Sequence, residues 1–202
     1  MRTHSTRFSG LTWLSAGLLF LATVALATPA SAQAPFGGAD DLAFSKALWQ
    51  ALQSNKLQGA GQITTVPYKG RDPHGMILET LTSEITVQGK KGKVVVKRNY
   101  GGPGITLSKV ANNRSEYLKA ITVMFKREAG FNPAAKDWFW AKYLANGSLD
   151  KAPNKLQMAG KVVGCIACHT AALSTDMVYT TAASYLGQYS AVALQDLRCC
   201  PP

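Results

Sequence analysis

The stretch SEITVQGKKGKVVVKRNY, residues 83–100, places runs of β-branched residues on either side of a step rich in glycine and lysine. Two such runs, separated by a few residues that include glycine, are typical of a β-hairpin. The overlapping stretch MILETLTSEITVQ, residues 76–88, fits a helix or a strand by its pattern alone, and its neighbours favour a strand. Residues 76–100 therefore predict two antiparallel strands joined by a turn.

Further strand-like runs lie on both sides of this hairpin. They are QITTVPY (62–68), YLKAITVMFKRE (117–128) and DWFWAKYLANG (137–147), the last ending in the turn signal Asn146-Gly147. Upstream, Asp40 and Asp41 are candidate caps for apolar residues at helical spacing, which predict one helix over residues 40–55. The predicted fold class is α+β, a mainly antiparallel β-sheet with flanking helices.

The N-terminal residues have the pattern of a secretory signal. Arg2, His4 and Arg7 precede an apolar stretch over residues 11–27, and small residues follow it up to Ala32. A retained membrane anchor is the alternative, but the apolar run is short and ends at a cleavage-like site. We expect residues 1–32 to be removed, and residues 33–202 to form a single exported domain without a membrane span, in a bacterial periplasm.

The charge of the chain limits its partners. Its 202 residues carry a formal net charge of +11, and removal of residues 1–32 takes away Arg2 and Arg7 and no acidic residue, which leaves about +9. This balance favours an anionic redox partner or substrate, or a membrane surface. Since no basic block is interleaved with aromatic residues, we expect no nucleic-acid binding.

The stretch GKVVGCIACHTAA, residues 160–172, carries the pattern Cys-x-x-Cys-His. One helical turn brings Cys165 and Cys168 to the same side, where each thiol can add to a vinyl group of haem, and His169 can bind the iron. A zinc site would need two more ligands, and a redox dithiol would need a βαβ pattern that the sequence lacks. The motif therefore predicts one covalent haem c, with His169 as its metal ligand.

The position of the motif distinguishes this chain from small electron-transfer cytochromes c. Those proteins usually carry the motif near the mature N-terminus and a methionine ligand well downstream. Here Met177 follows His169 by only eight residues, too close to reach the opposite face easily. The sixth iron position is therefore predicted to be open. For Cys199 and Cys200, a vicinal disulfide, pairing between subunits and two thiols all remain open.

Four stretches together resemble one known family. They are PYKGRDPHGMI (67–77), GKVVVKRNYGG (92–102), ITVMFKREAGFNPAAKDWFWAKYLANG (121–147) and the haem motif. Over residues 66–180 the chain resembles the cytochrome P-460 family, which includes the β-sheet cytochromes c′-β. The resemblance implies a mainly antiparallel sheet, a homodimer, and a five-coordinate haem that binds small nitrogen species such as hydroxylamine and nitric oxide.

The two branches of this family differ at one lysine. In the P-460 branch a lysine nitrogen is bonded to a haem meso carbon, and the resemblance makes Lys97 the candidate, with Lys109 second. The family usually has an acid after this lysine, where this chain has Arg98. The implied function is oxidation of hydroxylamine or nitric oxide, with electrons passed to another cytochrome. The alternative is a protein without enzymatic turnover that resembles the c′-β branch, and it either binds nitric oxide under a cap of aromatic side chains or transfers electrons.

Two more residues are candidates for the distal pocket. Oxidation of hydroxylamine releases protons, so a carboxylate would assist it, and the candidates are Glu128, after the apolar run ITVMF, and Asp137. His74, between Pro73 and Gly75, is predicted first as a turn residue, then as a pocket residue and last as an iron ligand. The aromatic residues of the stretch 138–143 are expected in packing, and Phe125 is a possible haem cap.

Overall fold

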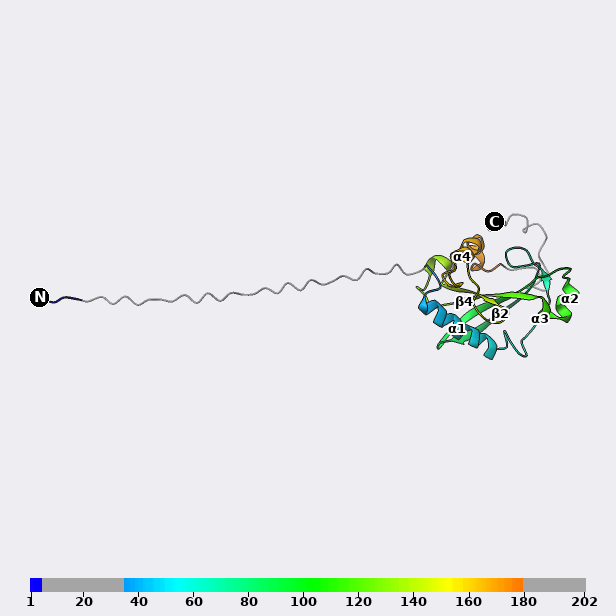
Figure 1. Cartoon of the computed structure of the whole chain (residues 1–202), viewed down its shortest axis with the longest axis horizontal. Coiled ribbons are helices and arrows are strands. Elements are labelled where there is room, and N and C mark those ends of the chain that lie inside the picture. Colours follow the sequence, from blue (N-terminus) through cyan, green and yellow to red (C-terminus); the bar gives the residue numbers. More distant parts are fainter. Residues whose placement is uncertain (5–34, 180–202) are drawn as a thin grey trace. The chain divides into compact units, whose positions relative to one another are not determined.

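The computed structural model describes residues 1–4 and 35–179, and within this part six strands form one antiparallel sheet in the order β1-β2-β3-β4-β5-β6 (Figure 1). Each strand pairs with the next along the chain. The strands are β1 (Tyr68–Lys69), β2 (Ile77–Val87), β3 (Lys90–Tyr100), β4 (Leu118–Lys126), β5 (Trp138–Leu144) and β6 (Ala159–Gly160). The α-helices are α1 (Ala39–Ser54), α2 (Leu107–Asn112), α3 (Arg114–Tyr117) and α4 (Val163–His169), with short 3₁₀ turns at Pro133–Ala135 and Thr170–Thr175.

The predicted hairpin over residues 76–100 is confirmed. Strands β2 and β3 pair along their whole length, from Ile77 opposite Tyr100 to Val87 opposite Lys90. The two turn residues, Gln88 and Gly89, both have positive φ, at 49° and 76°. This is the backbone of a tight hairpin turn whose twist matches the twist of the strands.

The run QITTVPY forms less sheet than its composition predicts. Only Tyr68–Lys69 pairs as a strand, while residues 62–67 run beside the sheet without joining its ladder. Pro67 has no N–H to donate, and the amide of Thr65 bonds instead to the carboxylate of Glu79 at 2.7 Å. Hydrogen bonds that involve side chains, rather than backbone pairing between strands, therefore hold this segment against the sheet.

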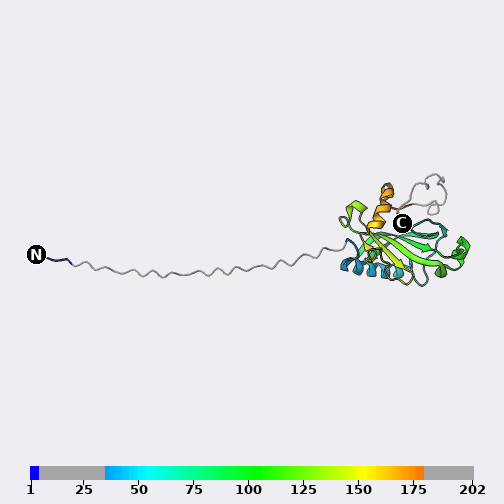
Figure 2. The ribbon, with the colours of Figure 1, turned by 45° about the horizontal axis from the view of Figure 1, so that its top comes forward.

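Helix α1 covers one face of the sheet, and α4 lies on the other side (Figures 1 and 2). The prediction of a helix over residues 40–55 is confirmed to within one residue at each end. Gly38 is the N-cap, whereas Asp40 and Asp41 lie in the first turn, where acidic groups interact favourably with the helix dipole.

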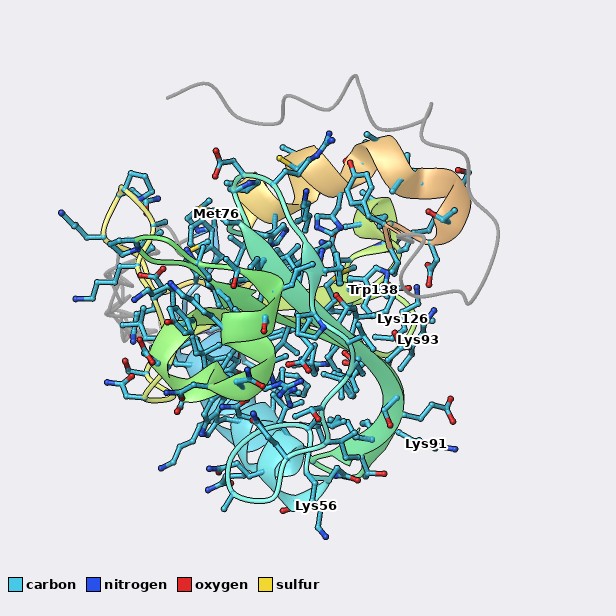
Figure 3. The ribbon with its side chains drawn as sticks, turned by 90° about the vertical axis from the view of Figure 1, so that its right-hand side faces the viewer. Lys56, Met76, Lys91, Lys93, Lys126 and Trp138 are labelled. Atoms are coloured by element: carbon cyan, nitrogen blue, oxygen red, sulfur yellow. The ribbon has the colours of Figure 1, made fainter. Side chains whose placement is uncertain are left out.

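Successive side chains along each strand point to opposite faces of the sheet, and an apolar cluster lies on each face. The α1 side of the sheet buries, among others, Leu81, Val94, Val96, Ile121, Phe125, Phe139 and Tyr143 against Phe44, Leu48 and Leu52 of the helix. The α4 side buries Val95, Met124, Trp138, Trp140, Val162 and Met177. On that side, Lys126 and Trp138 of neighbouring strands lie together, with the ammonium 4.5 Å from the ring centroid (Figure 3). The sheet therefore has two interior faces, and the second also carries the cysteine motif.

Some sequence predictions fall outside the described residues. They are the cleavage site after Ala32 and the states of Cys199 and Cys200, which stay predictions. No helix in residues 1–4 and 35–179 has the length and hydropathy needed to cross a membrane.

Candidate functional site

The Cys-x-x-Cys-His motif forms the short helix α4. One helical turn separates Cys165 from Cys168, and both side chains are half-buried, while His169 at the end of the helix is buried. Val162, just before the helix, is buried in the cluster on the α4 side of the sheet. This packing holds the motif against strands β3 to β5.

A backbone carbonyl fixes the ring of His169. Its Nδ1 lies 2.6 Å from the carbonyl oxygen of Met177. Because a carbonyl can only accept, Nδ1 carries the proton, and Nε2 is left with the lone pair that binds metals. Burial lowers the pKa of His169 to about 4, although the bond to Met177 acts in the opposite direction. The imidazole is therefore neutral at ordinary pH, which is the form that can bind a metal.

The same contact explains where Met177 lies. The chain turns back at Asp176 and Met177, whose φ angles are 57° and 61°, and this turn directs the Met177 carbonyl at the histidine ring. The Met177 side chain is fully buried in the cluster around Trp138. It does not line the cavity described next.

A cavity of about 390 Å³ lies between α4 and the sheet. Most of its lining is apolar, and both cysteines and His169 contribute to one wall. The polar side chains that line it are His74, Thr80, Lys97, Thr122, Trp140, Lys142, Lys151 and Tyr179. Mostly apolar walls with a few polar groups are typical of a cofactor or small-molecule site.

Lys97 lies in this cavity, together with the cysteine motif. It comes from β3, is half-buried, and within residues 35–179 its ammonium group has no hydrogen-bond or ion-pair partner. Burial alone lowers its pKa to about 8. Since the neutral amine is the nucleophilic form, Lys97 is far more available for bond formation than an exposed lysine.

Glu128 does not reach the cavity. It follows the end of β4, its side chain is 46% exposed, and it forms an ion pair with Arg127 at 2.9 Å. Arg127 in turn packs over the ring of Phe44, on the α1 side of the sheet. Neither Glu128 nor Asp137 is among the described residues that line the cavity, although β4 itself contributes to its wall. The second lysine candidate, Lys109, is also remote, since it lies on α2 and donates to the carbonyl of Gly104.

His74 lines the cavity, although the sequence ranked it first as a turn residue. Its Nδ1 lies 3.4 Å from Thr122 Oγ1, and its ring is perpendicular to that of His169 with centroids 6.2 Å apart. Burial lowers its pKa to about 3, and the nearby charge of Lys97 acts in the same direction. The signal in the sequence was that this is the only histidine of residues 33–202 besides His169.

The aromatic residues divide between the two faces. Trp140 packs edge-on against His169, with ring centroids 4.6 Å apart, and lines the cavity. Phe125 is buried on the α1 side, against Phe44, so it is not the haem cap that the sequence suggested. Phe139 lies on that side as well, which confirms a packing role.

The residues of the cavity fit a haem. Thiols and a neutral imidazole stand on one wall, and apolar side chains supply most of the rest. The indole N–H of Trp140 is buried without a partner among the described residues, and such a group normally has an acceptor. A bound group that fills the cavity could provide one.

Fold and site together define a class of protein, a haem cytochrome built on an antiparallel sheet. The family model described as Cytochrome P460 matches residues 77–180, and the chain belongs to this family. No curated protein and no solved structure matches the chain.

Proposed function

We propose that this chain is a periplasmic mono-haem c-type cytochrome of the P-460 type. Cys165 and Cys168 hold the haem, and His169 Nε2 binds its iron. The protein oxidises hydroxylamine, nitric oxide or both, and passes the electrons to another cytochrome. The observation that carries this proposal is that Lys97, without a partner among the described residues and with a pKa lowered to about 8, lines the same cavity as the haem motif.

The protein groups around the cavity support this activity in different ways. When bound, the haem supplies an open iron position and accepts electrons. The contact from Met177 holds His169 in the tautomer that binds metal. The apolar walls exclude water, and Lys97 lines the cavity, where its nitrogen would be the one joined to a haem meso carbon as the family implies. That bond would replace an amine N–H and a meso C–H bond, so it would need a two-electron oxidant.

The partners follow from charge and from the family. With about +9 charges on residues 33–202, the protein attracts an electron-acceptor cytochrome with an acidic surface. The family implies a homodimer. Residues 1–32 direct export to the periplasm, where signal peptidase removes them.

Haem attachment is the first test of the proposal. The full chain is expressed in a host that matures c-type cytochromes, and the periplasmic protein is weighed by mass spectrometry. We expect a protein that starts at Gln33 and carries the mass of one haem. The Cys165→Ala/Cys168→Ala variant should lose that added mass. Covalent haem in the double variant would disprove the attachment.

A nitric-oxide-binding protein of the c′-β type is the second candidate function. It is favoured by one observation, that no Asp or Glu is among the described residues that line the cavity. Hydroxylamine oxidation with a range of electron acceptors separates the two functions. Turnover supports the enzyme, whereas nitric oxide binding without any turnover, together with the spectrum of an ordinary haem c, supports the binding protein.

A further inference from the structure

The turn at Asp176 and Met177 presents a backbone carbonyl to His169, and two residues of the sheet bind this turn. We propose that Lys126 and Trp138 are positioning residues for the iron ligand. By fixing the turn, they keep the hydrogen bond to His169 short and so set how strongly this histidine donates electrons to the iron. This inference rests on the proposed haem site, and it assigns a role to two residues that are not among the described residues lining the cavity.

Strand pairing brings the two positioning residues together. Lys126 ends β4 and Trp138 begins β5, and they are directly opposite each other in the sheet. The ammonium of Lys126 lies 4.5 Å from the centroid of the Trp138 ring, on the α4 side (Figure 3). Trp138 is fully buried, whereas the side chain of Lys126 is 30% exposed. The ends of two neighbouring strands therefore place a buried indole and a charged group side by side.

Both residues donate a hydrogen bond to Asp176. The indole N–H of Trp138 donates to its backbone carbonyl at 2.8 Å, and the ammonium of Lys126 donates to its carboxylate at 2.5 Å. The backbone and the side chain of one turn residue are thus both attached to the sheet. Because the ion pair is partly exposed, solvent screens it, whereas the bond from Trp138 comes from a buried ring. We expect the indole to hold the turn more strongly than the ammonium.

The turn depends on such contacts because its backbone conformation is unusual. Asp176 and Met177 have φ angles of 57° and 61°, in the left-handed region. Aspartate is found there more often than most residues, but for methionine the conformation costs free energy that surrounding contacts must offset. Within the segment, the amide of Met177 donates to the carbonyl of Ala172 at 2.8 Å. This bond and the two from the sheet hold the Met177 carbonyl oxygen 2.6 Å from Nδ1 of His169.

The hydrogen bond at Nδ1 controls the electron donation of His169. An imidazole whose N–H is bound to an acceptor is more basic at its other nitrogen, and a more basic ligand favours ferric over ferrous iron. A loosened turn would lengthen this bond and therefore raise the reduction potential. Loss of the Lys126 charge alone would lower the potential, because removal of a nearby positive charge favours the ferric state. The sign of the shift therefore distinguishes an effect of position from an effect of charge.

The test uses the haem-loaded full chain and has two readouts, the reduction potential and the iron–histidine stretching frequency of the ferrous protein. Trp138→Phe keeps an aromatic ring, removes the N–H donor and changes no charge. We expect it to raise the potential and lower the stretching frequency, because the hydrogen bond to His169 weakens. Lys126→Met should lower the frequency by a smaller amount. Lys126→Arg, which keeps the charge and can still donate to Asp176, should stay closer to wild type.

Two control variants match these substitutions. Trp49→Phe changes a half-buried tryptophan of α1, on the other side of the sheet, whose ring packs against Tyr143. Lys91→Met removes the lysine of an exposed ion pair with Glu84. Both controls should leave the potential and the frequency at their wild-type values. Thermal unfolding of each variant shows whether the fold is intact, and Lys126→Met gives the answer if Trp138→Phe does not fold.

Two results would overturn the inference alone. Unchanged potential and frequency in folded, haem-loaded Trp138→Phe and Lys126→Met would show that the turn holds His169 without these residues. A lower potential in Lys126→Met with an unchanged frequency would show an effect of charge only. Absence of covalent haem from the wild type would overturn the proposed function together with this inference. Failure of hydroxylamine turnover, with the expected shifts present, would remove the enzyme and support the positioning role.

Discussion

Two neighbouring residues of β3, Lys97 and Arg98, are both cations inside the protein, and they point to opposite faces of the sheet. Arg98 is fully buried on the α1 side and donates to Glu79 at 3.2 Å, to the Leu57 carbonyl at 2.7 Å and to the Ile63 carbonyl at 2.9 Å. Lys97 has no such partner in the part of the chain that the structure describes.

The difference between these cations separates what the fold needs from what the site needs. A buried charge with partners is part of a network that folding must complete, and its loss leaves other groups unpaired. A half-buried amine without partners among the described residues adds no such network to the fold, and its place in the cavity beside the haem motif supports the proposed chemical role. The α1 face is therefore structural, and the α4 face carries the function.

Glu79→Gln tests the structural face and has the largest expected effect. Glu79 is fully buried and accepts hydrogen bonds from Arg98, Tyr100, Arg114 and the amide of Thr65. Removal of its charge leaves Arg98 buried without a counter-ion, so the free energy of unfolding should fall by about 3–5 kcal/mol. Denaturant titration measures it.

Glu84→Gln is the matched control for this substitution. Glu84 lies on the same strand, its side chain is 62% exposed, and its ion pair with Lys91 is at the surface. Such a pair contributes little, so the stability should change by less than about 1 kcal/mol. If the two substitutions lowered the free energy of unfolding equally, the buried network around Glu79 would not be the structural feature that we describe for the α1 face.

The ionisation of Glu79 should also make the free energy of unfolding depend on pH, and this effect is smaller than that of the substitution. Burial acts to raise its pKa, but the bonds from Tyr100 and Thr65 and the charges of Arg98 and Arg114 outweigh it and lower the pKa. A carboxyl with a lowered pKa stabilises the fold above its ordinary pKa, and this contribution is lost as the pH falls through the lower, folded value.

This contribution is measured from the free energies of unfolding of wild type and Glu79→Gln at several pH values between about pH 6 and about pH 3. The wild type should lose more stability on acidification than Glu79→Gln does, so the two curves converge. Parallel curves would show that Glu79 is already protonated in the folded protein.

The sequence predicted the structural face better than the site. The turn residues were enough to predict the hairpin, and alternation along a strand places neighbours such as Lys97 and Arg98 on opposite faces. Cys165, Cys168 and His169 follow from a local motif. The cavity depends on contacts between distant segments, such as His74 near Thr122, and no local pattern encodes them.

Two residues that were expected at the haem pocket, Glu128 and Phe125, lie elsewhere for physical reasons. Glu128 follows an apolar strand, but its side chain is 46% exposed and is not among the described residues that line the cavity. Phe125 obeys strand alternation, yet alternation does not tell which face of a sheet meets the haem motif. The packing of helix α4 against the sheet decides which face meets the motif. This packing depends on contacts between segments that are far apart in the sequence.

Lys97→Met tests the functional face and has the smallest expected effect on stability. Because no described group pairs with Lys97, its replacement by an apolar side chain of similar size leaves no charge behind. The free energy of unfolding should change by less than about 1 kcal/mol, or rise. Lys93→Met, an exposed residue four positions earlier on β3 and labelled in Figure 3, is the control and should change neither stability nor spectrum. A loss as large as that of Glu79→Gln would make Lys97 a structural residue.

Peptide mapping of the haem-loaded protein tests the central claim, that the unpaired lysine on the α4 face is the one bonded to haem. After protease digestion, mass spectrometry identifies every peptide attached to the haem. We predict that a peptide containing Lys97 stays joined, through the haem, to the peptide that contains Cys165 and Cys168. A haem bonded to lysine should also give the ferrous protein absorption at unusually long wavelength, and Lys97→Met should abolish both the join and this absorption. Haem attached to the cysteine peptide alone in the wild type, with the spectrum of an ordinary haem c, would contradict the account.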